Sequence, residues 1–225
     1  MAGTTRLKIY NGALLLCGER SLASLSEERE PRRLLDVVWD KGGVRYCLEQ
    51  GQWQFAMRTQ MIQPDPDIEP AFGYNNAFTK LDDWVLTSAV CTDERFRTPL
   101  LAYNDELQNW YADISPIYVK FVSDDEDYGS NLAIWPNSFC DYVEAYFASQ
   151  IIYKLNADKE RVQMLFGRPG DIRGGELARR YTIAKSRAAM TQPTQIPAEG
   201  MWNRSRRGRY RGPMGDGGTS GGLIG

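Results

Sequence analysis

The chain contains no histidine in its 225 residues. Histidine is the commonest general base of enzymes and the commonest zinc ligand. Its absence removes the Ser-His and Cys-His pairs of most nucleophilic hydrolases. No serine or lysine has an evident partner group nearby in the sequence. We therefore expect a protein that is not an enzyme and that needs no metal and no cofactor.

Cysteine is also scarce. The four cysteines are Cys17, Cys47, Cys91 and Cys140. They are separated by 30, 44 and 49 residues, a spacing that matches no zinc-binding pattern. Each lies among apolar residues. We therefore expect reduced cysteines in the core, as is usual for a protein made in a cytosol.

Long hydrophobic runs are missing too. No stretch approaches the roughly 18 apolar residues that a membrane span needs. The first apolar stretch, "GALLLC", is shorter than the core of a signal peptide, roughly 7–15 residues. Leu7, Tyr10, Leu14 and Cys17 recur at helical spacing, so we predict a helix over 5–17 and no membrane partner.

Charge is unevenly distributed. The formal net charge is -2. Residues 201–225, which begin "MWNRSRRGRYRG", carry five arginines and one aspartate, so residues 1–200 have a net charge of -6. We expect the basic end to act on something acidic.

The apolar spacing predicts a helical protein with a β-rich middle. A second helix opens at Pro31 and runs through Tyr46, with a kink or close contact at Gly42-Gly43. The most apolar helix opens at Pro136. We expect it at the centre of a bundle, because the apolar residues on one side of it form a wide stripe. These residues are Phe139, Tyr142, Val143, Tyr146, Phe147 and Ile151. Further helices are expected at 157–166 and 174–190, separated by "GRPGDIRGG", which we interpret as a turn because it lacks the phosphate-loop spacing.

Strands are expected between these helices. The alternation of apolar residues favours strands over 53–61, around 84–91, 100–103, 106–111 and 116–122. A turn is expected at Asn104-Asp105. In the last strand, Ile117, Val119 and Phe121 should face inward. "PDPDIEP" (64–70) should be irregular. The predicted fold class is α+β: an α-helical bundle (1–192) with a β-rich block inserted at about 53–122, followed by an extended C-terminal arm (193–225).

An acidic loop follows the last strand and contains Asp124, Asp125, Glu126 and Asp127. Its spacing fits no calcium loop. Three alternatives remain: a solvated hairpin tip, a charged interface or channel lining, and a metal site.

The arm is the most informative segment. It is a solubilising tail, a nucleic-acid-binding segment, or an arm that binds a partner protein. In the last case the arginines pair with carboxylates and four apolar residues act as anchors. These candidate residues are Trp202, Arg204, Arg206, Arg207, Arg209, Tyr210, Arg211, Leu223 and Ile224.

The order of several stretches resembles the head-to-tail connectors of tailed phages, of the tail tubular protein A type. The stretches are "RLKIYNGALLLCGE", "RRLLDVVWDKGGVRYCLEQGQWQFA", "FTKLDDW" without the family's proline, and "YVKFVS" with its acidic loop and "WPNSFCDYVEAYFASQIIYKL". The likeness runs over about residues 5–190 and rests on the order of these stretches.

This resemblance implies a structural virion protein at the head-tail junction, assembled in the bacterial host cytoplasm. It would be a ring-forming adaptor, and twelvefold symmetry would match the portal. The ring would bind the portal on one face and a tail nozzle or tail tube protein, with a tail fibre as a further candidate, on the other. Genomic DNA would pass through its channel without specific binding. On this basis we expect Asp124–Asp127 to face the channel or the tail-side partner and the arm to bind the portal. The surplus of Tyr and Trp suits interfaces. The alternative function is a nucleic-acid-binding protein that uses its Arg-Gly arm.

Overall fold

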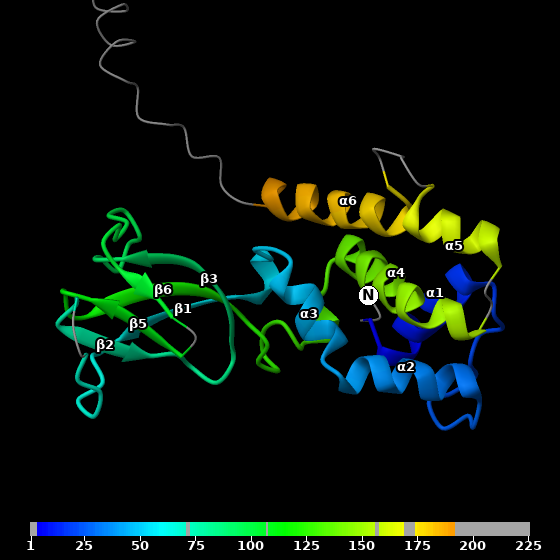
Figure 1. Ribbon diagram of the computed structural model, residues 1–225, viewed down its shortest axis with the longest axis horizontal. Coiled ribbons are helices and arrows are strands. Elements are labelled where there is room, and N and C mark those ends of the chain that lie inside the picture. The colour runs from blue at the N-terminus through cyan, green and yellow to red at the C-terminus, as the bar shows by residue number, and fades with distance from the viewer. Residues whose placement is uncertain (1–3, 71–72, 107, 156–157, 169–173, 192–225) are drawn as a thin grey trace, which may run out of the picture. The chain divides into compact units, whose positions relative to one another are not determined.

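A computed structural model describes residues 4–70, 73–106, 108–155, 158–168 and 174–191. Within them the protein is α+β, as the sequence predicts (Figure 1). The arm at 193–225, with all nine of its candidate residues, lies outside the described residues.

The helices surround one central member. They are α1 (Arg6–Cys17), α2 (Glu30–Asp40), α3 (Gly43–Glu49), α4 (Asn137–Leu155), α5 (Lys159–Phe166) and α6 (Glu176–Met190). Each of the other five contacts α4. The apolar stripe of α4 explains this position, because Phe139, Val143, Phe147 and Ile151 are all buried. The predicted central helix is confirmed.

The helix α1 matches its prediction closely. Thr5 caps it, since the Thr5 hydroxyl accepts a hydrogen bond from the Lys8 backbone N–H at 3.4 Å. Gly18 ends it in the left-handed conformation at φ +73°.

The second predicted helix is in fact two helices. Gly42 has φ +82°, which a helix interior does not allow, so the chain ends α2 and starts α3 there. A Cβ atom on Gly43 would lie 2.7 Å from the Val38 carbonyl oxygen. The pair of glycines therefore makes a sharp break with close packing, where the sequence predicted a kink.

Between α3 and α4, the described residues form six strands in two antiparallel sheets. One sheet has the order β1 (Met57–Ile62), β6 (Ile117–Ser123), β3 (Trp84–Cys91). The other has the order β2 (Asn76–Thr79), β5 (Asn109–Ala112), β4 (Asn104–Asp105). They share a core that includes Ile117, Val119 and Phe121, so the predicted inward face of the last strand is confirmed.

Several strand predictions were wrong. Residues 54–56 form a short 3-10 helix, η1 (Gln54–Ala56), before β1, because Trp53 and Phe55 pack on Phe139 of α4 with ring centroids 4.8 Å away. No strand occupies 100–103, and Asn104-Asp105 pairs with β5 as β4 where a turn was predicted. The strand β2 was not predicted. Residues 64–70 are irregular, as expected.

All four cysteines are buried and free, which confirms the prediction of reduced core cysteines. Burial raises the pKa of the Cys17 thiol to about 11. Among the described residues, none of the helices combines the length and the apolar character needed to cross a membrane.

Candidate interaction surfaces

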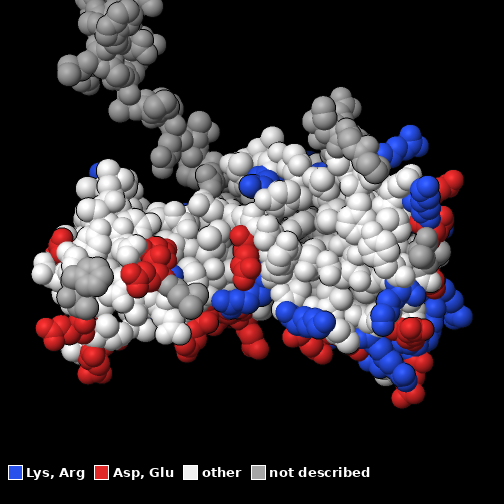
Figure 2. All heavy atoms as spheres, viewed as in Figure 1, with Lys and Arg blue, Asp and Glu red and all other residues white. Residues whose placement is uncertain are grey.

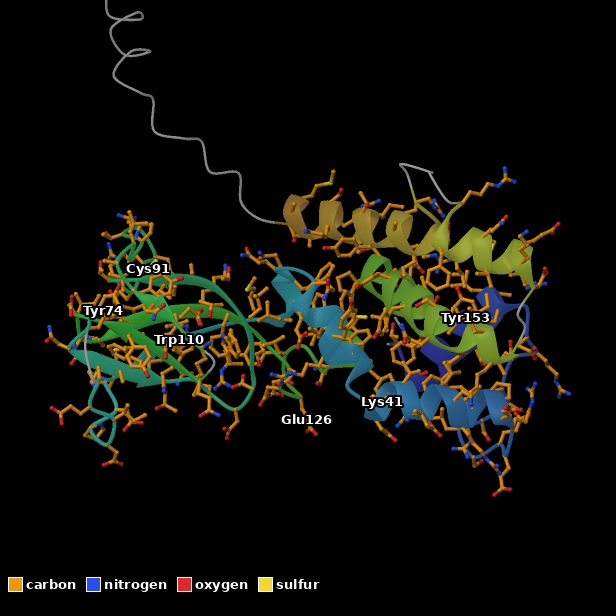
Figure 3. All side chains as sticks on the ribbon, in the orientation of Figure 1. Lys41, Tyr74, Cys91, Trp110, Glu126 and Tyr153 are labelled. Carbon is orange, nitrogen blue, oxygen red and sulfur yellow. The ribbon has the colours of Figure 1, made fainter. Side chains whose placement is uncertain are left out.

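The acidic loop connects β6 to α4, so it is not the hairpin tip that was one alternative. Its first carboxylates are engaged within the protein. Asp124 pairs with Arg45 of α3, and the carboxylate of Asp125 accepts a hydrogen bond from the Asp127 backbone N–H at 2.9 Å. Only Glu126 and Asp127 are exposed. Figure 3 shows Glu126 pointing away from the ribbon.

The base of the loop is anchored by a partly buried polar cluster of Ser123, Asp83 and Arg58. Ser123 donates a hydrogen bond to Asp83, and Arg58 pairs with Asp83 at 2.8 Å. Burial alone would raise the pKa of Asp83, but these two partners outweigh it and hold that pKa below its usual value. Gly129 passes so close that a Cβ atom there would lie 2.2 Å from the Ser123 carbonyl oxygen. The loop is therefore fixed in place and presents a small acidic tip.

The carboxylates of the loop should therefore differ in their contribution to stability. We expect the double change Glu126→Gln with Asp127→Asn to leave the unfolding free energy within about 0.5 kcal/mol, because both side chains are exposed. Asp124→Asn should destabilise the protein, since it leaves Arg45 without this partner. Denaturant titration of both variants checks this. Equal unfolding free energies for the two variants would contradict this expectation.

No metal site emerges from the loop. Among the residues that the structure describes, no three Asp, Glu or Cys side chains gather closely enough to hold a metal ion. The charged-surface alternative remains for Glu126 and Asp127, and it stays a prediction.

Charge separates between the helices and the strands. Residues 57–127 carry fourteen acidic and five basic residues, a net charge of -9. The rest of residues 1–200 has a net charge of +3. On the face in Figure 2, red side chains dominate the strand region, while blue ones gather over the helical region. An acidic partner surface for a basic segment therefore lies in this chain itself.

An apolar groove lies beside the start of the strands. It has a volume of about 670 Å³ and is lined by η1, the first turns of α4 and the last turns of α6. Trp53 and Phe139 line it together with Ile183, Ala188 and Met190. Met190 is 77% exposed, which is high for a large apolar side chain. Sequence reasoning missed this groove because its walls come from three segments far apart in the chain.

The aromatic residues serve mainly the core. Trp53, Trp110 and Trp135 are buried, so their abundance does not by itself indicate an interface. Tyr46 stacks on Tyr146 at 4.7 Å, and Tyr153 stacks on Phe166 at 5.9 Å, on the outside of the bundle. Tyr153 is 63% exposed and is labelled in Figure 3. Of the abundant tyrosines and tryptophans, the exposed Tyr46 and Tyr153 are available to contact a partner.

The "FTKLDDW" stretch forms a closed cluster in the strands. Its turn forms without the family's proline, since the Trp84 backbone N–H donates to the Leu81 carbonyl at 3.0 Å. Lys80 lies 3.6 Å from the Trp84 ring centroid and 2.5 Å from Asp105. Its side chain is 5% exposed. The ammonium already fills this aromatic cage, so the cluster is structural.

One carboxylate is partly buried among the helices, with its side chain 19% exposed. Glu144 of α4 lies against Gly12 of α1, where a Cβ atom would come within 2.0 Å of its carboxyl carbon. Arg180 of α6 is 3.7 Å away but also donates to Glu176 at 2.8 Å. Desolvation, aided by Asp141 and opposed by Arg180, raises the pKa of Glu144 to about 7. This group can exchange a proton near neutral pH.

Comparison with known proteins leaves this geometry as the main guide. No protein-family model matches the chain, and no curated protein matches it either.

Proposed function

We propose that this chain is a ring-forming adaptor of the head-to-tail connector of a tailed phage. The observation that supports this most is where the connector-like stretches lie. They supply α1, α2, α3 with Trp53, and α4, which together make the core of the bundle. The likeness therefore includes residues that form the core of the bundle.

The charge of the strand region suits a DNA channel. A wall with a net charge of -9 over residues 57–127 repels phosphates, so DNA slides without sticking. In this proposal Glu126 and Asp127 face the channel or the tail-side partner, and the arm binds the portal. The ring is twelvefold, like the portal, and sits in the virion at the head-tail junction, where a tail nozzle or tail tube protein, or a tail fibre, attaches.

The oligomeric state tests the proposal. We expect sedimentation and particle imaging of the purified chain to show closed rings, either alone or after mixing with the phage portal. Imaging of rings also reports their symmetry. A monomer under both conditions contradicts the proposal.

A second candidate function rests on the Arg-Gly segment. Residues 201–225 carry a net charge of +4, which suits phosphate binding. If the chain binds nucleic acid, its affinity for DNA should fall steeply with salt, and deletion of 201–225 should abolish it. Binding that survives this deletion would place the contact elsewhere.

A further inference from the structure

The apolar groove between η1, α4 and α6 has the properties of an unfilled docking site. Its volume of about 670 Å³ lies within the range of sites that enclose a ligand, about 300–1,000 Å³. Its floor is built from Trp53, Phe55 and Phe139. Ile183 and Met190 of α6 remain 42% and 77% exposed at its edge. An apolar side chain entering the groove would cover Ile183 and Met190, whereas Trp53 and Phe139 are already buried.

Two polar groups in the groove lack a partner within the described ranges. The amide nitrogen Nε2 of Gln54 is buried and donates no hydrogen bond there. A buried donor without an acceptor costs free energy, about 1–3 kcal/mol, and a rotation of the Gln54 side chain toward the groove would let an entering backbone carbonyl accept this hydrogen bond. The carboxylate of Asp141 is exposed and makes no ion pair with any described residue. It is placed to receive a cation.

The chain's own C-terminal segment carries the matching chemistry. Thr191, the last described residue, itself lines the groove, and 34 residues follow it. Among them, Trp202 is a large apolar anchor and Arg204 lies two positions further on. An extended backbone supplies the carbonyl groups that Gln54 needs.

We propose that the groove binds the segment around Trp202 of a neighbouring copy of this chain. Trp202 fills the apolar floor, a nearby backbone carbonyl accepts from Gln54, and Arg204 pairs with Asp141. The remaining arginines, Arg206 to Arg211, then lie against the acidic strand region (57–127) of the receiving copy.

A neighbouring copy fits better than the same copy. The last turn of α6 forms one wall of the groove, so the chain leaves at the rim and must reverse direction to enter its own groove. Ten residues separate Thr191 from Trp202 and span up to about 35 Å when extended. That length reaches an adjacent subunit.

Exchange of this kind rests on the self-association in the proposed function. It assigns Trp202 to Arg211 to a neighbouring copy, so the part of the arm that remains for the portal is the stretch beyond Arg211, which contains Leu223 and Ile224. Each copy gives one arm and receives one. In a head-to-tail arrangement such contacts close in a ring when the rotation between copies closes. Many weak arm contacts then reinforce each other through effective concentration.

Disulfide trapping in the full-length chain tests the exchange. Ile183→Cys places a thiol on the groove edge, and Asn203→Cys places one beside Trp202. The native cysteines are buried, so they compete little. After mild oxidation we expect a crosslinked two-chain product only when the two variants are mixed. Adding Trp202→Ala to the Asn203→Cys chain should remove this product, and high salt should reduce it.

Leu101→Cys gives the matched control, because Leu101 is 90% exposed and does not line the groove. It should not crosslink to Asn203→Cys. A crosslink within single chains of the Ile183→Cys, Asn203→Cys double variant, with none in the mixture, shows that the arm folds back and overturns the exchange. Rings without any crosslink overturn the exchange and leave the ring proposal standing, whereas monomers without crosslinks contradict both.

Discussion

Trp53→Ala should lower the unfolding free energy by about 3–5 kcal/mol, the usual cost of removing a buried tryptophan. Trp53 is 1% exposed and packs on Phe139 at 4.8 Å and on Tyr142 at 6.1 Å. Its indole N–H lies 3.1 Å from both the Cys47 and the Leu48 carbonyls in the last turn of α3. The side chain therefore joins α3, α4 and the start of β1. A domain of this size should melt roughly 10 °C lower.

Two further variants separate the contributions. Trp53→Phe keeps much of the apolar contact but loses the N–H, so it should lie between the wild type and Trp53→Ala. Leu101→Ala truncates a side chain that is 90% exposed and should change stability by less than about 0.5 kcal/mol. Thermal and denaturant unfolding measure all three. If Trp53→Ala unfolds like Leu101→Ala, the bundle does not depend on this contact.

Trp53 also shows where sequence reasoning succeeds and where it fails. Helical spacing over many turns predicted α1 and α4, since a wide apolar stripe has few alternative structures. The strands β3 and β6 were predicted for a similar reason. The alternation of Trp53, Phe55 and Met57 imitated a strand, but contact with Phe139, more than eighty residues later, determines the local structure instead.

Turn chemistry was the other weak point. Gly42 was identified as a disturbance, but its positive φ, which separates α2 from α3, depends on the close approach of Gly43 to Val38. The pair Asn104-Asp105 has typical turn residues, yet it pairs with Tyr111 and Trp110 of β5. Short strands such as β2 and β4 have too few residues to show a period.

The candidate sites were predicted only in part. The acidic loop was located correctly, but the engagement of Asp124 by Arg45 joins residues 79 positions apart and leaves no local pattern. The sequence shows neither the groove nor the partly buried position of Glu144, because each arises where segments from distant parts of the chain meet.

Glu144 should make the stability of this protein depend on pH between about 4.5 and 7. Its pKa is about 7 in the folded protein and about 4.5 in the unfolded chain, because burial between α1, α4 and α6 disfavours the carboxylate. Folding therefore favours the protonated form. The stability that this group contributes is fully present below pH 4.5 and is lost as the pH rises through 7.

The chain contains no histidine, so no imidazole group titrates in this pH range alongside Glu144. Of the described residues, only Glu144 has its pKa moved into the range from 5 to 8. Glu176, which shares Arg180 with Glu144, shifts the other way. Hydrogen bonds from Arg179 and Arg180 lower the pKa of Glu176 to about 2, so its contribution is present above pH 4.5 and is lost as the pH falls toward 2.

Glu144→Gln should therefore stabilise the protein at pH 8 and leave it almost unchanged at pH 4.5. The amide keeps the shape of the side chain and removes the buried charge, and Arg180 retains Glu176 as its partner. Solvent still reaches part of the carboxylate and screens it, so we expect a gain of about 1–2 kcal/mol at pH 8. Denaturant unfolding at pH 4.5, 6 and 8 measures the effect. Glu176→Gln is the matched control, because it should destabilise at pH 8. A Glu144→Gln variant that loses stability at pH 8 would show that the carboxylate is charged and well paired with Arg180.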